Sequence, residues 1–276
     1  MILLDKNDYF KALEPLQSVE INHLFASAVI EGHIGGTIYV DDVDNPASFY
    51  VVHPYGMSLL FGHTPNEEFN SWLLGHALNI FNVRDRYEWL QAFPDTWNKQ
   101  IATRWEQHLV KSKDSAGALK NKKIEEHTRV NFKFNKDKYL DFKSNYPLLN
   151  IKTHRTDNQM FGAIQGSVIP ARFWDNVDDF SRRAVAFSVL DGDKVASTAF
   201  SAFVVGKQLE IGIETSDAYR GKGYAIYTCM ALIDYCLEHD YEPIWACRLE
   251  NTASYQLAQK LGFEPTVYWP FYRLND

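Results

Sequence analysis

One stretch of the chain combines residue types that together form an anion site. Leu209–Thr215 alternates apolar side chains with Glu and Gly, which is typical of a strand with two different faces. After a turn at Ser216–Tyr219, the segment Arg220–Ala225 (Arg-Gly-Lys-Gly-Tyr-Ala) opens a helical pattern that continues to His239. The first N–H groups of a helix have no partner within the helix, and the macrodipole adds positive potential there. Because glycine carries no side chain, a phosphate reaches those donors directly, and the stretch predicts a phosphate-binding turn.

The spacing of the glycines excludes two common phosphate sites. A dinucleotide fingerprint needs a third glycine where this chain has Ile226, and a Walker loop needs Lys where it has Tyr224. The residues do match Arg-x-x-Gly-x-Ala, at Arg220, Gly223 and Ala225. This motif resembles the acyl-CoA pyrophosphate loop of the GNAT N-acetyltransferase superfamily. A glycine-rich turn that only caps an ordinary helix is the alternative interpretation.

A second motif downstream strengthens the resemblance. Pro243–Leu249 has the composition of a short buried strand, and the helical pattern after it begins with Asn251 as N-cap and ends before Gly262. The matching GNAT segment is Asn-x-x-Ala/Ser-x-x-Leu-x-x-Lys-Leu-Gly-Phe, and this chain carries it in register at Asn251, Ser254, Leu257, Lys260, Leu261, Gly262 and Phe263. With the run Glu210–Thr215, the chain looks closest to the zwittermicin-resistance-type branch. The resemblance is clear over residues 160–265.

The resemblance implies a fold and a co-substrate. The fold is mixed α/β, with a C-terminal GNAT domain whose mostly antiparallel central sheet is flanked by helices. The co-substrate is acetyl-CoA (coenzyme A), bound without a metal. The residues implied to contact it are Ile213, Thr215, Arg220, Gly221, Lys222, Gly223, Tyr224, Ala225, Asn251 and Ser254. Asn251 has an equal claim to be only the N-cap of its helix.

Acyl transfer to an amine requires a neutral nucleophile. A lysine-like amine has a pKa of ~10.4, so losing its proton at neutral pH costs on the order of 4–5 kcal/mol unless a carboxylate, a water relay or desolvation offsets it. Glu210 and Glu214 share one face of the predicted strand. Glu214 is nearer the glycine turn and is our candidate general base, with Glu210 as the second candidate. The alternatives are a base elsewhere, desolvation alone, or two glutamates that merely cover a solvated face.

The predicted general acid departs from the family pattern. The superfamily often supplies a tyrosine just after the helix leucine for the departing thiolate, and here that position is Ala258. Tyr255 lies three residues earlier, rotated about 60° around the helix, and is the candidate in its place. A thiol with a pKa of ~8.5 is also a tolerable leaving group without an acid.

Composition excludes several other classes of protein. The chain has 276 residues, 46% of them hydrophobic, and a formal net charge of −7, which provides a packed core but no basic footprint for nucleic acid or an anionic membrane. Cys229, Cys236 and Cys247 form no C-x-x-C unit and are expected to be buried free thiols in a reducing compartment. The nine histidines lack metal-ligand spacing, and no signal peptide or membrane span is visible. We expect a metal-free cytoplasmic protein, either a monomer or a homodimer.

The length favours two domains. We place the boundary near residue 145, with a smaller mixed α/β domain at 1–145 and the GNAT domain at 146–276. The order of elements in the first half loosely mimics the second, so a degenerate copy of the same fold is one interpretation, although it has no pyrophosphate loop. Lys111–Lys123 is predicted to be a solvated loop or frayed helix.

Local patterns predict the elements of both halves. In the first half we expect strands at 37–40, 48–52 and 57–61, then a helix capped by Thr64 or Asn66. In the second half we expect a strand at 148–152, a helix at 170–183 and a hairpin at 186–205 whose turn is Asp-Gly-Asp.

Three functions from different classes are compatible with these residues. The first is an N-acetyltransferase that moves an acetyl group from acetyl-CoA to the primary amine of a small molecule, of the amino-polyol or aminoglycoside kind. The second is a non-catalytic acyl-CoA-binding or regulatory protein, which the missing tyrosine favours. The third is an acetyltransferase of protein amines, with the first half as a partner-docking domain.

Overall fold

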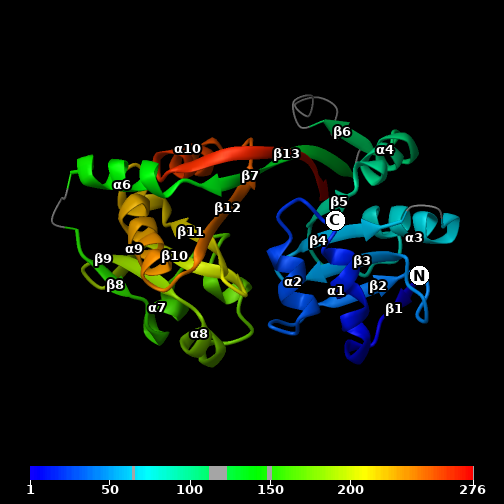
Figure 1. Cartoon of the computed structure of the whole chain (residues 1–276), viewed down its shortest axis with the longest axis horizontal. Coiled ribbons are helices and arrows are strands. Elements are labelled where there is room, and N and C mark those ends of the chain that lie inside the picture. The colour runs from blue at the N-terminus through cyan, green and yellow to red at the C-terminus, as the bar shows by residue number, and fades with distance from the viewer. Residues whose placement is uncertain (64–65, 112–122, 148–150, 276) are drawn as a thin grey trace. The chain divides into compact units, whose positions relative to one another are not determined.

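The chain folds into two compact units. The computed structural model describes residues 1–63, 66–111, 123–147 and 151–275 (Figure 1). The first unit contains Met1–Val130, Arg248–Glu250 and Val267–Asp276, and the second contains Asn131–Cys247 and Asn251–Thr266. Two long strands, β7 (Ile124–Phe134) and β13 (Phe263–Leu274), therefore contribute residues to both units.

The first unit is a helix-flanked sheet. Its strands are β1 (Ile2–Leu3), β2 (Thr37–Val40), β3 (Ser48–His53), β4 (Met57–Gly62), β5 (Glu88–Phe93) and β6 (Leu109–Lys111). Its helices are a 3-10 segment (Lys6–Ala12), α1 (Leu13–Leu16), α2 (Leu24–Ile30), α3 (Glu67–Ala77) and α4 (Asp95–Arg104). The sheet runs β1-β2-β3-β4-β5-β13 and is antiparallel except for the parallel pair β4 and β5. Apolar side chains of α3 and α4, such as Phe69 and Trp97, pack on it to form the core.

Local sequence signals place these elements well. The predicted strands at 37–40, 48–52 and 57–61 are confirmed as β2, β3 and β4. Of the two predicted caps of α3, Asn66 is confirmed, because its side-chain oxygen accepts a hydrogen bond from the N–H of Phe69 at 3.0 Å. Thr64 lies outside the described residues, as does most of the loop predicted at Lys111–Lys123.

The second unit has the mostly antiparallel sheet that the sequence predicts. Its strands are β8 (Thr153–Arg155), β9 (Ala186–Asp191), β10 (Lys194–Val205), β11 (Gln208–Thr215) and β12 (Glu242–Arg248). Its helices are α6 (Lys136–Asn145), α7 (Asn158–Ala163), α8 (Val177–Arg183), α9 (Tyr224–Glu238) and α10 (Thr252–Lys260), with 3-10 turns at Pro170–Arg172 and Asp217–Tyr219. The sheet runs β12-β11-β10-β9-β8, and only β11 and β12 are parallel. Helix α9 packs on β9, β10 and β11.

Two predicted elements of the second unit need correction. The single helix predicted at 170–183 is wrong: a 3-10 turn ends at Arg172, and α8 starts afresh after Asn176, whose side chain caps it by accepting from the N–H of Asp179 at 2.9 Å. The strand predicted at 148–152 lies partly outside the described residues, and the strand of this region is β8, which starts at Thr153. The predicted hairpin is confirmed as β9 and β10, with Gly192 at φ 58° in its turn.

The order of elements repeats along the chain. In each half three antiparallel strands lead through a helix to a parallel strand, and a second helix and a long strand follow: β2-β3-β4-α3-β5-α4-β7, then β9-β10-β11-α9-β12-α10-β13. The short strand β6, between α4 and β7, has no counterpart among the described residues of the second half. The long last strand of each half crosses into the other unit, because 131–134 of β7 belongs to the second unit and 267–274 of β13 to the first. This order is the one that a degenerate copy of the fold would have.

Candidate active site

The site begins where two parallel strands separate. Strands β11 and β12 are paired at Gln208 with Glu242, Leu209 with Pro243 and Glu210 with Ile244. No further pair joins them among the described residues, although β11 continues to Thr215 and β12 to Arg248. Beyond Glu210, β11 is therefore paired on one edge only.

The register with β10 shows which groups occupy the open edge. The N–H of Ser216 donates to the carbonyl of Ala196 at 3.0 Å, so this residue pair is of the hydrogen-bonded kind. In an antiparallel ladder the two kinds of pair alternate, and the amides of every second residue point away from the partner strand. The amides of Ile213 and Thr215 consequently face the edge that β12 has left.

The glycine turn follows directly at the end of β11. Gly223 is the N-cap of α9 with φ 80°, and Gly221 has φ 78°, a left-handed conformation that residues with a Cβ rarely adopt. A Cβ added at Gly221 would meet no atom within 4 Å, so backbone conformation rather than space requires glycine there. The strand, turn and helix that the motif predicts are confirmed, and the first N–H groups of α9 lie at the turn.

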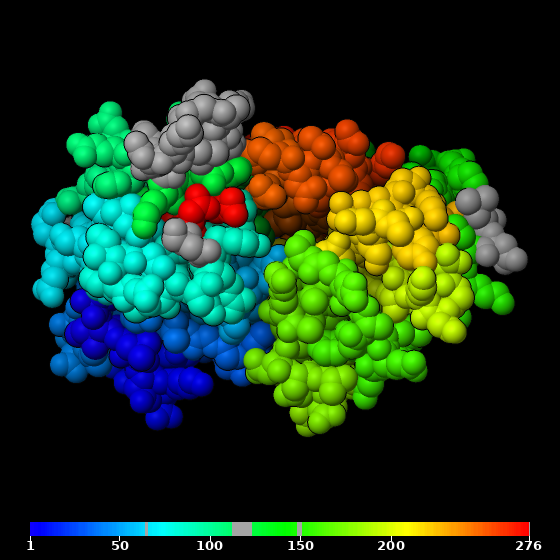
Figure 2. All heavy atoms as spheres, turned by 180° about the vertical axis from the view of Figure 1, so that it is seen from behind, coloured from blue at the N-terminus to red at the C-terminus, as the bar shows by residue number. Residues whose placement is uncertain are grey.

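A pocket of about 530 Å³ in the second unit joins the turn, the open edge and α10. It is lined by Ser167, Val168, Ile213, Glu214, Thr215, Tyr219, Arg220, Gly221, Gly223, Tyr224, Ala225, Asn251, Ala253, Ser254, Leu257 and Lys260. In the space-filling view, yellow atoms from the region around residue 220 lie next to orange atoms of α10 (Figure 2). Every residue predicted to contact the co-substrate lines this pocket except Lys222, whose Nζ lies 4.9 Å from the centroid of the Tyr219 ring.

Glu214 is held in the pocket wall by backbone donors. Its Oε2 accepts hydrogen bonds from the N–H groups of Ser167 and Val168, both at 2.8 Å, and its Oε1 accepts from the N–H of Thr215 at 3.3 Å. A Cβ added at Gly166, which has φ 143°, would lie 2.4 Å from the Glu214 carboxyl carbon. The loop at 166–168 thus wraps one oxygen of the carboxylate, and the guanidinium of Arg220 lies 3.8 Å from the other.

The two other predicted catalytic residues lie outside the pocket lining. Glu210 is 5% exposed and sits at the last position of β11 that pairs with β12, between Phe203 of β10 and Ile244 of β12. Tyr255 points away to pack on Phe132, with 5.5 Å between ring centroids. The catalytic roles of Glu210, Glu214 and Tyr255 stay predictions.

Helix α10 supplies the opposite wall. Asn251 caps it, since the side-chain oxygen accepts from the N–H of Ser254 at 3.2 Å, and the same residue also lines the pocket. Ser254 Oγ accepts a hydrogen bond from the indole N–H of Trp245 at 3.2 Å. Ala258 is fully buried beneath this face of the helix.

Several lining residues had no role in the sequence-based prediction. Ser167 and Val168 come from an irregular segment between short helices, where no periodic pattern marks a site. Leu257 and Lys260 belong to the downstream motif but were given no contact with the co-substrate. Ala253 was not singled out, although all three recur with Ser254 at the three- and four-residue spacing of one helix face. Burial and the nearby Asp191 carboxylate raise the pKa of Tyr219, another residue missed, so its phenol stays protonated at neutral pH.

The donors present fit an acyl-CoA. The turn offers first-turn amides and the cationic side chain of Arg220, which is 66% exposed and pairs with Asp217 at 2.9 Å. The open edge of β11 offers backbone amides to an extended amide-bearing arm. Within the described ranges, no three His, Cys, Asp or Glu side chains are grouped to hold a metal, and no helix there is long and apolar enough to cross a membrane.

The cysteines take no part in the site. Cys229, Cys236 and Cys247 are buried thiols that form no disulfide, as predicted. Burial raises the pKa of the Cys236 thiol to about 12 and also raises that of Cys229. Neither thiol ionises near neutral pH, so neither is a nucleophile.

Comparison with known proteins agrees with the geometry. A Bacillus subtilis protein described as an uncharacterized N-acetyltransferase, YdfB, is 26% identical over 251 residues, which cover 90% of this chain and 89% of the relative. A GCN5-related N-acetyltransferase-like protein from Streptococcus suis has the same fold, with a TM-score of 0.71, 19% identity and coverage of 97% of this chain and 99% of that one. A tandem GNAT protein from the clavulanic acid biosynthesis pathway aligns with a TM-score of 0.60 and 12% identity over 99% of this chain and 97% of that one. The family model for GNAT acetyltransferases matches residues 15–272, and the chain therefore belongs to the GNAT acetyltransferase family.

Proposed function

We propose that this acyltransferase moves an acetyl group from acetyl-CoA to the primary amine of a small molecule, of the amino-polyol or aminoglycoside kind. The observation that carries the proposal is the pocket in which a glycine turn at a helix start meets the open edge of a separated strand. Acetyl-CoA supplies the activated acyl group as a thioester. Family members share this chemistry. What we propose for this chain is the role of each pocket residue and the class of the acceptor amine.

Each part of the pocket has a distinct task in this proposal. The first-turn amides of α9 and the Arg220 side chain hold the pyrophosphate. The amides of Ile213 and Thr215 on the open edge bond the extended arm and stabilise the oxyanion that forms as the amine attacks the carbonyl. To do so, the Thr215 amide exchanges its 3.3 Å bond to Glu214 Oε1 for the ligand. Because these donors are fixed in a strand, they need little reorganisation during the reaction.

Glu214 is the proposed general base, directly or through one water. Two backbone donors at 2.8 Å occupy its Oε2, whereas its Oε1 accepts one longer hydrogen bond, from the N–H of Thr215 at 3.3 Å, so Oε1 is the oxygen that takes the proton from the amine. At neutral pH that proton costs on the order of 4–5 kcal/mol to remove, and a base near the attacking nitrogen offsets part of this cost. Glu210 is the weaker candidate, because it is outside the pocket lining.

The acceptor is proposed to be cationic and small. The chain carries a net charge of −7, which attracts a cationic amine by long-range electrostatics. A non-catalytic acyl-CoA-binding function is the second candidate, since the pocket lining contains neither a tyrosine at position 258 nor Tyr255. Acetylation of protein amines is the third.

Two measurements on the full chain separate these functions. Calorimetry measures the binding of acetyl-CoA, and a thiol-reactive dye measures coenzyme A release with a panel of small amines and lysine peptides. We expect tight acetyl-CoA binding, and we expect coenzyme A release with amino-polyol-like or aminoglycoside-like compounds. Binding without release on any amine would favour the non-catalytic protein, release with peptides alone would favour protein amines, and absent binding would refute all three.

A further inference from the structure

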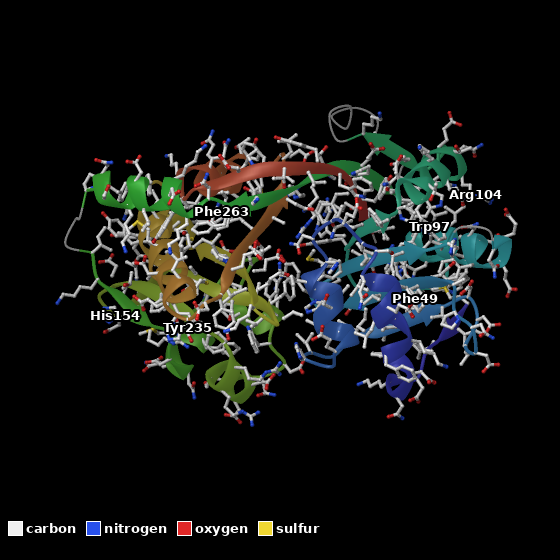
Figure 3. All side chains as sticks on the ribbon, in the orientation of Figure 1. Phe49, Trp97, Arg104, His154, Tyr235 and Phe263 are labelled. Atoms are coloured by element: carbon white, nitrogen blue, oxygen red, sulfur yellow. The ribbon has the colours of Figure 1, made fainter. Side chains whose placement is uncertain are left out.

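The hydroxyl of Ser254 is oriented by a buried indole. Ser254 lies in the first turn of α10, and its Oγ accepts the N–H of Trp245, which is 2% exposed. Trp245 is itself fixed by packing on Phe263, with ring centroids 5.4 Å apart, and Phe263 points into the interior of the second unit (Figure 3). A hydroxyl has one proton to donate and lone pairs to accept with. Because a lone pair faces Trp245, the proton is directed elsewhere.

That proton has no acceptor among the described residues. The other interaction of Ser254 is through its backbone N–H, which bonds the side chain of Asn251. The Ser254 hydroxyl therefore lines the pocket with a proton that it can donate to a ligand. An unused donor on a pocket wall costs little while water reaches it, and it becomes useful when a ligand brings an acceptor.

The other pocket hydroxyls are differently placed. Ser167 Oγ donates to the Glu214 carboxylate at 3.4 Å, and Thr215 Oγ1 is paired with Ser197 Oγ at 2.8 Å. Tyr219 lies beside the Asp191 carboxylate, and Tyr224 is the first residue of α9, at the pyrophosphate end. Ser254, in contrast, is hydrogen-bonded to Trp245. This tryptophan directly follows Ile244, the last residue of β12 that pairs with β11. The Ser254 hydroxyl thus lies at the point where the two strands part.

We propose that Ser254 donates a hydrogen bond to the sulfur that departs during acyl transfer, with Trp245 as its positioning residue. This inference rests on the proposed function. It assigns to Ser254 the task that the missing tyrosine at position 258 would have, for which Tyr255, packed on Phe132 and outside the pocket lining, is the other candidate.

Acyl transfer is complete without transfer of the serine proton to sulfur. The amine nitrogen forms a bond to the acyl carbon and gives a proton to Glu214, and the carbon–sulfur bond breaks with its electron pair going to sulfur. Ser254 keeps its proton, because an alcohol is a much weaker acid than a thiol of pKa ~8.5. It stabilises the charge on sulfur by hydrogen bonding, and the sulfur later takes a proton from solvent.

Binding measurements test this role apart from turnover. A donor aimed at sulfur favours the thiolate, so coenzyme A bound to the wild-type chain should have a thiol pKa below ~8.5, and its affinity should rise between pH 6.5 and 9. Desulfo-coenzyme A, which lacks the sulfur, should show no such rise. In Ser254→Ala we expect the increase in coenzyme A affinity between pH 6.5 and 9 to be about tenfold smaller, which corresponds to a bound-thiol pKa one unit higher. Desulfo-coenzyme A should bind to this variant as it does to the wild type.

Three further variants make the result specific. Ser254→Thr keeps a hydroxyl and should restore the pH dependence, and Trp245→Phe keeps the packing but should weaken that dependence. Thr252→Ala removes an exposed hydroxyl from the same helix turn, outside the pocket lining, and should change nothing. The proposal would be overturned if Ser254→Ala lost affinity for coenzyme A and desulfo-coenzyme A equally, or if the pH dependence of its coenzyme A affinity were unchanged. If the wild-type chain bound neither ligand, the proposed function itself would fail.

Discussion

Glu210 and Ile244 are the last residues that hold β11 and β12 together, and the pocket opens immediately beyond them. The corresponding parallel strands of the first unit, β4 and β5, stay paired over all but one residue of each, from Met57 with Trp89 to Phe61 with Phe93. The same order of elements thus leaves an open strand edge in one unit and a closed sheet in the other. Separation of the strands, rather than the fold itself, makes room for a ligand.

We predict that one chain binds one acetyl-CoA. In the first unit no strand edge is open between β4 and β5, and the start of α3 is also unsuited to phosphate. Asn66 already caps that helix with its own side chain, and Glu67 and Glu68 place negative charge in the first turn. Titration calorimetry should give a stoichiometry of one. A second equivalent site would show that the first unit opens in solution.

Gly223→Asp should abolish or strongly weaken coenzyme A binding. The variant places a carboxylate at the N-cap of α9, against the pyrophosphate, and we expect the Kd to rise roughly tenfold or more. Gly206→Asp is the matched control, because Gly206 also has a positive φ, 56°, and open space around it, but lies outside the pocket lining. Equal losses in both variants would attribute the effect to backbone strain rather than to the turn.

Glu214→Gln should reduce kcat about 100-fold or more while leaving the affinity for coenzyme A nearly unchanged. The amide keeps an acceptor oxygen for the N–H groups of Ser167 and Val168, but it takes no proton from the amine. Glu210→Gln, in the same strand, is expected to have little effect on kcat. A large loss in Glu210→Gln with normal rates in Glu214→Gln would transfer the base to Glu210.

The residues predicted best are those whose signal is local. Asn66 and Asn251 cap helices because a short side-chain acceptor sits three residues before a free N–H, which is visible in the sequence. The turn at Gly223 is equally local, since its positive φ depends on that residue alone. The signals at Gly223 and Asn251 therefore located the starts of α9 and α10, the two helices of the pocket.

What the sequence could not reveal depends on contacts between distant segments. Where β11 and β12 part is decided by how far two strands, whose paired residues are 34 apart in the sequence, stay in register, and no residue type marks that point. The hydrogen bonds from Ser167 and Val168 to Glu214 join segments 46 and 47 residues apart. Strand β13 was not predicted, because its alternation is interrupted by Pro265 and Pro270, and because its two partners, β5 and β7, are distant in the sequence.

His53 should make the protein less stable in mild acid. Its ring is fully buried in β3, its Nδ1 accepts the N–H of Tyr55 at 3.0 Å, and burial lowers its pKa to about 3. In the unfolded chain the pKa is ~6.5, so between about pH 6.5 and 3 the unfolded state binds the extra proton and gains stability relative to the folded state. This contribution is absent above pH 7 and reaches about 2 kcal/mol at pH 5.

His53→Gln isolates that contribution, because glutamine offers an acceptor to Tyr55 but does not titrate. We expect the variant to lose less unfolding free energy than the wild type between pH 7.5 and 5, by about 2 kcal/mol in urea denaturation followed by tryptophan fluorescence. The exposed His154, at the surface of the second unit (Figure 3), provides the control, and His154→Gln should follow the wild-type curve. Parallel pH profiles for the wild type and His53→Gln would mean that His53 is protonated in the folded chain, and that its ring is less isolated from solvent than its burial indicates.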